Sequence, residues 1–123
     1  MSESLACDRA LTEYQGPRTI CEELEGGVGW RSFRVVKQYL RRIVLVPERD
    51  ILDAVAFAFG RLGLIVEPSA AVVLAAVVSG RLTVDERTVL IISGGNLDGD
   101  VLQRCLSARL QTTAEPRSER RVG

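Results

Sequence analysis

The stretch that decides the fold is residues 66–98, VEPSAAVVLAAVVSGRLTVDERTVLIISGGNLD. Pro68 suits the first turn of a helix, and the residues after it are apolar on nearly every side until Gly80 ends the helix. A polar turn then leads to TVLII (88–92), a run of β-branched residues and leucine that predicts a buried strand. A helix without a polar face must be covered all round, so the stretch indicates a layered α/β core.

The rest of the chain adds helices and a second strand. Apolar residues with helical spacing, together with start and stop signals, predict four helices, near 31–40, 48–62, 69–79 and 99–109. IVLV (43–46) predicts a strand that lies beside 88–92 and parallel to it. The expected fold class is therefore α/β, a partial parallel sheet with flanking helices.

The chain is expected to divide into three parts. Residues 1–16 are polar and predict an irregular N-terminal segment, which ends at the breaker pair Gly16-Pro17. Residues 17–110 carry all the periodic elements and form the folded segment. Residues 111–123 are polar and charged, and they predict a disordered tail.

Composition excludes several classes of function. The 16 basic residues balance the 16 acidic ones and aromatic residues make up only 5%, so neither a nucleic-acid partner nor a membrane partner is expected. Cys7, Cys21 and Cys105 show no pairing pattern and indicate reduced thiols, which together with the lack of a signal peptide predicts a cytoplasmic protein. The chain has no histidine and one lysine, Lys37, and no metal site is predicted.

The segment SGGN (93–96) has two interpretations. Glycine and asparagine tolerate positive φ, so the segment is an ordinary way to leave a strand. Alternatively, Gly94 and Gly95 let the backbone approach a ligand closely while Ser93 supplies one directed hydroxyl. The segment alone does not decide between them.

Four stretches together resemble a known family. They are TICEELEGGVG (19–29), VPERDILDAV (46–55), VEPSAAVVLAAVVSGRL (66–82) and TVLIISGGNLD (88–98). In this order and spacing they resemble the C-terminal part of pyridoxal-phosphate enzymes of the tryptophan-synthase-β-like fold, in particular threonine and serine dehydratases (ammonia-lyases) and serine racemases. The resemblance covers residues 17–110.

The resemblance implies a set of cofactor-binding residues. Ser93 matches the serine whose hydroxyl donates to the pyridine nitrogen of pyridoxal 5'-phosphate, and Gly94, Gly95 and Asn96 match the turn beside the ring. Glu67 matches the glutamate that approaches the ring in the family, although a carboxylate that stabilises the helix N-terminus is an equal alternative. No catalytic residue is assigned to this chain.

Some residues depart from the family's pattern. Ala70 stands where the family has the glycine of PSGA, and Glu23 stands where TICEGL has a glycine. Glu22 and Glu25 are interpreted as solvated or structural carboxylates. The chain contains neither the S-x-K-x-R-G segment that provides the covalent lysine nor the GGGG loop that binds the cofactor phosphate, and Lys37 matches neither.

The resemblance therefore implies a part of an enzyme. A full-length relative would eliminate water from L-threonine or L-serine and release a 2-oxo acid and ammonia. This chain is expected to be inactive without a complementing N-terminal half, with that half or a homo-oligomer as its partner. The alternative is a non-catalytic α/β module that binds a partner; a small nucleotide-binding domain is less favoured because no G-x-G-x-x-G string is present.

Overall fold

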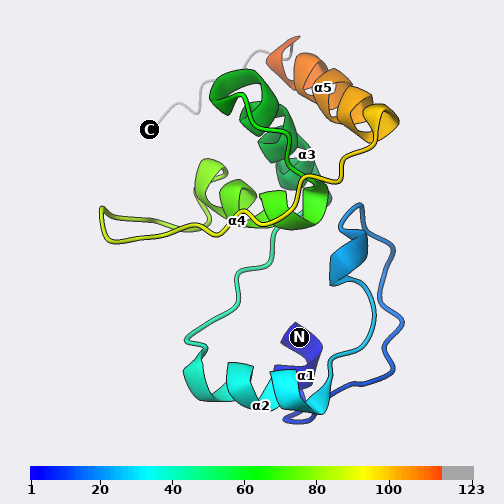
Figure 1. The fold of residues 1–123 in the computed structure, drawn as a ribbon, viewed down its shortest axis with the longest axis vertical. Coiled ribbons are helices and arrows are strands. Elements are labelled where there is room, and N and C mark those ends of the chain that lie inside the picture. The colour runs from blue at the N-terminus through cyan, green and yellow to red at the C-terminus, as the bar shows by residue number, and fades with distance from the viewer. Residues whose placement is uncertain (115–123) are drawn as a thin grey trace, which may run out of the picture.

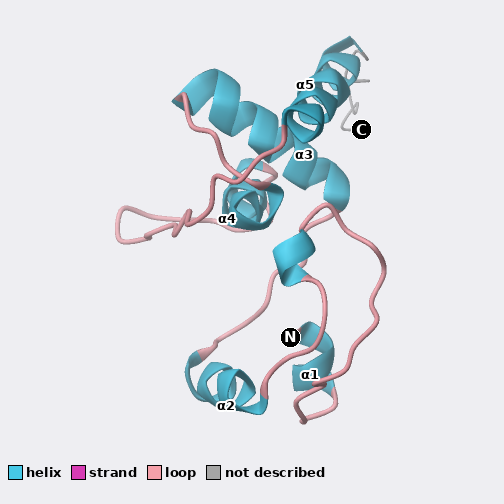
Figure 2. Ribbon diagram, turned by 45° about the vertical axis from the view of Figure 1, so that its right-hand side comes forward, coloured by secondary structure: helices cyan, strands magenta, loops and turns pink. Residues whose placement is uncertain are grey.

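The computed structural model describes residues 1–114 and shows a helical protein (Figures 1 and 2). Its elements in chain order are α1 (Ser2–Ala6), a 3₁₀ turn η1 (Glu22–Leu24), α2 (Trp30–Tyr39), α3 (Glu48–Phe57), a π-helical turn η2 (Ala58–Leu62), α4 (Pro68–Val78) and α5 (Gly99–Ala114). The four predicted helices are confirmed, but α5 continues to Ala114, past its expected end near residue 109. Residues 111–114, predicted to belong to a disordered tail, are therefore helical, and the remainder of that predicted tail, 115–123, lies outside the described residues. One short helix, α1, lies in the segment that was expected to be irregular.

The expected parallel sheet does not form within residues 1–114. Residues 43–46 and 88–92, both predicted as strands, are extended segments without a β-ladder, so the sheet in the expected fold class is wrong for this chain. The reason is that a strand is stabilised by hydrogen bonds to a neighbouring strand, and neither segment has one beside it. The outward side chains are consequently left in solvent: Val89 is 83% exposed and Ile91 74%.

The core lies where α3 packs against α4 and α5 (Figure 1). Its centre consists of small side chains, and Ala54, Ala71, Ala75 and Cys105 have no exposed surface. Such residues allow the helix axes to approach closely, while the larger Val55 fills the space between them. The strongly apolar α4 is covered on most sides, because among residues 70–78 only Val78 is exposed.

The helix predicted at 48–62 changes its winding before it ends. It is α-helical to Phe57 and continues as the wider turn η2 to Leu62. Gly63 then adopts a left-handed conformation with φ 66°. The backbone N–H of Leu64 donates to the carbonyl of Ala58 at 3.0 Å. Gly63 therefore has the C-capping role that its position predicts.

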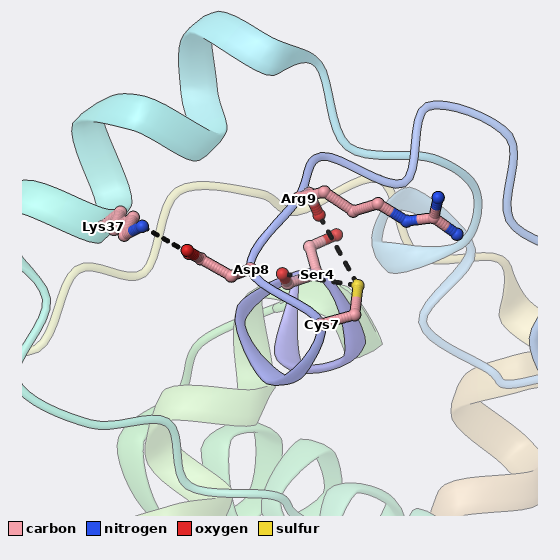
Figure 3. Close-up of polar contacts among 5 residues, drawn as sticks. All are labelled: Ser4, Cys7, Asp8, Arg9 and Lys37. Carbon is pink, nitrogen blue, oxygen red and sulfur yellow. Dashed lines mark hydrogen bonds and ion pairs between the residues drawn. The ribbon is translucent and has the colours of Figure 1, made fainter.

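The N-terminal helices α1 and α2 pack against each other and lie apart from the α3–α4–α5 body in both views (Figures 1 and 2). Buried Ser4 on α1 accepts a hydrogen bond from the N–H of Leu11 at 3.2 Å. Lys37 on α2 forms an ion pair with Asp8, which follows α1 (Figure 3). The two N-terminal helices therefore contact each other over a small area, with the Lys37–Asp8 ion pair at its edge.

The cysteines are free thiols, as the sequence predicts. Cys7 is exposed, whereas Cys21 and Cys105 are buried, and burial raises the pKa of both buried thiols. Over residues 1–114, no helix is both long and apolar enough to cross a membrane.

Candidate functional site

The site forms where the loop after residues 88–92 passes the N-terminus of α4. Glu67 is the N-cap of α4, with an extended backbone, and its carbonyl accepts hydrogen bonds from the N–H groups of Ala70 at 3.1 Å and Ala71 at 2.9 Å. Pro68 follows it as the first helical residue, a position at which its lack of an N–H costs nothing. The sequence Glu67-Pro68-Ser69 therefore sets the start of α4 and, with it, the backbone position from which the Glu67 side chain extends.

Two hydrogen bonds join Glu67 to the SGGN loop. The N–H of Asn96 donates to Oε2 of Glu67 at 3.1 Å, and the N–H of Glu67 donates to the carbonyl of Gly94 at 3.2 Å. These residues are 27 to 29 positions apart in the chain, so only the tertiary fold brings them together. Glu67 thus holds the loop through both its carboxylate and its backbone, in addition to starting α4.

The two loop glycines lie close to neighbouring groups of the chain. A Cβ on Gly94 would lie 1.9 Å from Oε1 of Glu67, and one on Gly95 would lie 3.1 Å from the carbonyl oxygen of Ile65. Neither glycine has positive φ, in contrast to Gly63 and Gly80. The tolerance of glycine for positive φ is therefore not used at Gly94 and Gly95, and the close approach of neighbouring groups accounts for both.

Ser93 lies on the exposed side of this loop. Of the five predicted cofactor-binding residues, Glu67 contacts Gly94 and Asn96 directly, and Gly95 packs against the backbone of Ile65. The hydroxyl of Ser93 is therefore available to solvent at the end of the extended segment 88–92.

A hollow of about 280 Å³ lies next to Glu67 and Asn96. The residues that line it come from the segment 19–23, which includes the start of η1, from the start of α4, and from the loop before α5 with the first turns of that helix: Thr19, Ile20, Glu22, Glu23, Glu67, Pro68, Asn96, Leu97, Asp98, Val101 and Arg104. Four of these are carboxylates and one, Arg104, is a cation. The hollow therefore has an acidic lining, to which sequence reasoning assigned only Glu67 and Asn96.

The segment 19–25 is fixed against the body by carboxylates. The N–H of Ile20 donates to Oε2 of Glu48 at 3.0 Å, and the N–H of Thr19 donates to Oε1 of Glu25 at 2.9 Å. The hydroxyl of Ser69 donates to the carboxylate of Glu23, and this hydrogen bond lowers the pKa of Glu23. Glu23, which departs from the family's glycine, thus connects η1 to the start of α4.

The sequence predicted only in general terms what the carboxylates of segment 19–25 do. The sequence predicts that Glu22 and Glu25 are solvated or structural carboxylates. Glu25 accepts a hydrogen bond from the backbone N–H of Thr19, and Glu22 is exposed where it lines the hollow. Within residues 1–114, no group of three or more Asp, Glu or Cys side chains is arranged to hold a metal ion.

Comparisons with known proteins give one consistent result. A family model described as "Pyridoxal-phosphate dependent enzyme" matches residues 1–94. Serine racemase of Dictyostelium discoideum is 33% identical over 95 residues, which are 74% of this chain and 29% of the racemase. L-threonine ammonia-lyase of Thermotoga maritima is 32% identical over 79 residues, 64% of this chain and 20% of the lyase.

The fold agrees with the sequence matches. Maize serine racemase superposes with a TM-score of 0.69 at 26% identity, over 92% of this chain and 36% of that chain. The chain therefore spans between 20% and 36% of the relatives it matches.

Proposed function

Because the chain belongs to the family of pyridoxal-phosphate-dependent enzymes, we propose that it forms the ring-facing part of the cofactor site in a threonine or serine dehydratase. The reaction of the assembled enzyme is elimination of water from L-threonine or L-serine, which yields a 2-oxo acid and ammonia. The observation that carries the proposal is the convergence of Glu67 with the Ser93–Asn96 loop, which contains four of the five residues that match the family's cofactor site.

The residues present fit the pyridine end of the cofactor. The exposed Ser93 hydroxyl is a neutral donor for the ring nitrogen, and Glu67 fixes the loop that carries it. When bound, the cofactor supplies the electron sink for loss of the α-proton and the β-hydroxyl. A hydroxyl is too weak an acid to protonate the pyridine, which favours elimination over transamination.

The residues do not fit the phosphate end of the cofactor. A dianionic phosphate requires backbone N–H groups or cations, whereas the adjoining hollow presents carboxylates of Glu22, Glu23, Glu67 and Asp98 against Arg104 alone. Lys37 is paired with Asp8 in the α1–α2 pair, not at the loop (Figure 3). The covalent lysine and the phosphate loop are therefore assigned to a complementing polypeptide.

A test combines the full chain with the N-terminal part of the Thermotoga maritima lyase, expressed without the segment that this chain matches. The chain alone with pyridoxal phosphate should show neither the visible absorbance of bound cofactor nor formation of 2-oxo acid from L-threonine. The mixture should show both. Borohydride should not attach the cofactor to Lys37, and stoichiometric labelling of Lys37 would contradict the assignment.

Variants of Ser93 sharpen the test. Ser93→Ala should lower kcat of the mixture by about a hundredfold or more, in the range for loss of one hydrogen bond in an active site. Ser93→Thr retains a hydroxyl and should retain most activity, and Ser79→Ala, on another exposed serine, which follows α4, should change nothing. Full activity of Ser93→Ala would reject the proposed role.

The second candidate is a non-catalytic module that binds a partner. The acidic hollow favours it, because that lining is the part of the site least suited to the cofactor. It predicts association with the lyase part without cofactor absorbance in any mixture. The absorbance measurement therefore distinguishes the two functions.

A further inference from the structure

Residues 79–92 leave the body as a protruding loop in both views (Figures 1 and 2). Its tip is an ordered turn at Asp85, whose carboxylate accepts hydrogen bonds from the N–H of Arg87 at 3.0 Å and the hydroxyl of Thr88 at 2.9 Å. The N–H of Asp85 donates to the hydroxyl of Thr88 at 3.1 Å. The turn therefore presents the following limb, residues 88–92, in a defined direction.

The limb 88–92 has the side-chain pattern of a strand but not the pairing. Val89 and Ile91 are 83% and 74% exposed, whereas Leu90 and Ile92 are half-buried and Ile92 packs on the core. Within the described part of the chain, the backbone groups of 89–92 form no hydrogen bond with another segment. An apolar extended segment with unpaired backbone groups is a template for a further strand.

A second extended segment shows the same alternation. Leu45 is 70% exposed and Ile43 37%, while Val46 packs against the core. Neither 43–46 nor 88–92 contains a charged residue, so their outward side chains suit the interior of a protein more than its surface. Both segments therefore expose apolar side chains that strands of another polypeptide could cover.

The length of the relatives indicates what this layer is. In maize serine racemase, the region equivalent to this chain is 36% of one continuous polypeptide, and the rest belongs to the same molecule. We propose that residues 88–92 are an edge that pairs with a strand of the polypeptide that carries the rest of the enzyme. This inference rests on the proposed function and names the docking surface.

Docking at this edge would also order the site. Ser93 follows residue 92 directly, and Glu67 holds Gly94 and Asn96 at the other end of the loop. A strand paired to 88–92 would fix the second end of the same loop. The loop that carries the Ser93 hydroxyl would then be fixed at both ends. Assembly of the two polypeptides would therefore also position the hydroxyl for the cofactor.

The experiment uses the full chain and the Thermotoga maritima lyase lacking its matched segment, studied by light scattering and hydrogen–deuterium exchange. A one-to-one complex should form, and the amides of residues 89–92 should exchange more slowly in it than in the free chain. A single-chain fusion of the same two parts provides a second measurement. Absence of slowed exchange at 89–92 in both the mixture and the fusion would overturn the proposal.

Matched variants locate the surface. Ile91→Asp should weaken association roughly tenfold or more, as expected for a charge placed in an apolar interface. Val35→Asp alters a side chain that is 57% exposed on α2, away from the limb, and should leave association unchanged. Equal effects of the two variants would refute docking at 88–92. Circular dichroism of each free variant checks that the helices persist.

The outcomes separate this inference from the proposed function. Slowed exchange at 89–92 without cofactor absorbance supports the docking edge and rejects the catalytic role. A different result would be a homodimer in which the amides of 89–92 exchange slowly, with no binding of the lyase part. It would overturn the proposed partner, because the edge would then pair with a second copy of this chain.

Discussion

The α3–α4–α5 body and the α1–α2 pair show two ways in which a helix is stabilised. The body buries Ile51, Val55 and Leu74 around a seam of alanines, with α3 packed against both α4 and α5. Among residues 1–46, only Ser4, Cys21 and Phe33 are buried. Each helix of the N-terminal pair has essentially one partner, which is the other helix.

The difference shows that helical periodicity does not measure stability. The amphipathic helix α2 forms as expected, yet Trp30, Val35 and Tyr39 are 54%, 57% and 74% exposed. The guanidinium groups of Arg31 and Arg34 lie over the Trp30 ring at 5.6 and 5.7 Å, which covers part of it. The body carries most of the apolar burial, and the free energy of unfolding should depend on it accordingly.

Truncation of a core side chain should have the largest effect. Ile51 on α3 is 3% exposed, and Ile51→Ala should lower the free energy of unfolding by about 2–5 kcal/mol through lost burial and a cavity. Val35→Ala on the outer face of α2 should change it by less than about 0.5 kcal/mol. Urea denaturation of the two variants measures both. Similar losses would show that the two regions share one core.

Substitution of Gly94 should have the second-largest effect on the free energy of unfolding. Gly94→Ala places a Cβ against the Glu67 carboxylate, which must move and give up its bond to the Asn96 N–H, at a cost of about 1–3 kcal/mol. Gly99→Ala is the control, because a Cβ there meets nothing within 4 Å and the change should be within about 0.5 kcal/mol. Faster exchange of the Asn96 amide in Gly94→Ala alone would confirm that the loop is released.

The contact between Glu23 and Ser69 should contribute a pH-dependent part of the stability. Since the hydrogen bond lowers the pKa of Glu23 from its ordinary value of 4.5, the contribution is present above that value and is lost as the pH falls through the lower folded-state pKa. Ser69→Ala should therefore be less stable than the parent protein near pH 7, with a difference that shrinks below pH 4.5. The midpoints of urea unfolding of Ser69→Ala and of the parent protein, measured at several pH values from 7 to below 4.5, test this expectation.

The control for this experiment is Ser79→Ala, which removes an exposed hydroxyl from the other end of α4. Its urea midpoints should follow those of the parent protein at every pH. A difference between Ser69→Ala and the parent that persists unchanged at acid pH would contradict the role of the Glu23 carboxylate.

The smallest effect is expected for the ion pair of the N-terminal helices. Lys37 and Asp8 have side chains that are 52% and 69% exposed, so Lys37→Ala should cost about 0–1 kcal/mol, and less at high salt. A double-mutant cycle with Asp8→Ala isolates the pair. A coupling larger than that of a typical exposed pair would show that α1 and α2 are held more rigidly than their burial indicates.

The sequence by itself determined the helices and the family. The four longer helices form their hydrogen bonds within one segment each, so the spacing of apolar residues, Pro68 and Gly63 was sufficient to locate them, whereas the five-residue α1 carries no such signal. The motifs around Glu67 and SGGN also identified the family, since their order and spacing survive in the sequence.

The tertiary structure alone decided the strands and the contacts of the site. A strand requires a neighbour, and residues 88–92 carry a strand pattern that no described segment completes. The bonds of Glu67 to the loop and of Glu23 to Ser69 join positions 27 to 46 residues apart, and no local pattern specifies which carboxylate meets which donor. Such contacts exist only after the helices have packed, because packing sets the distances between segments that are remote in the chain.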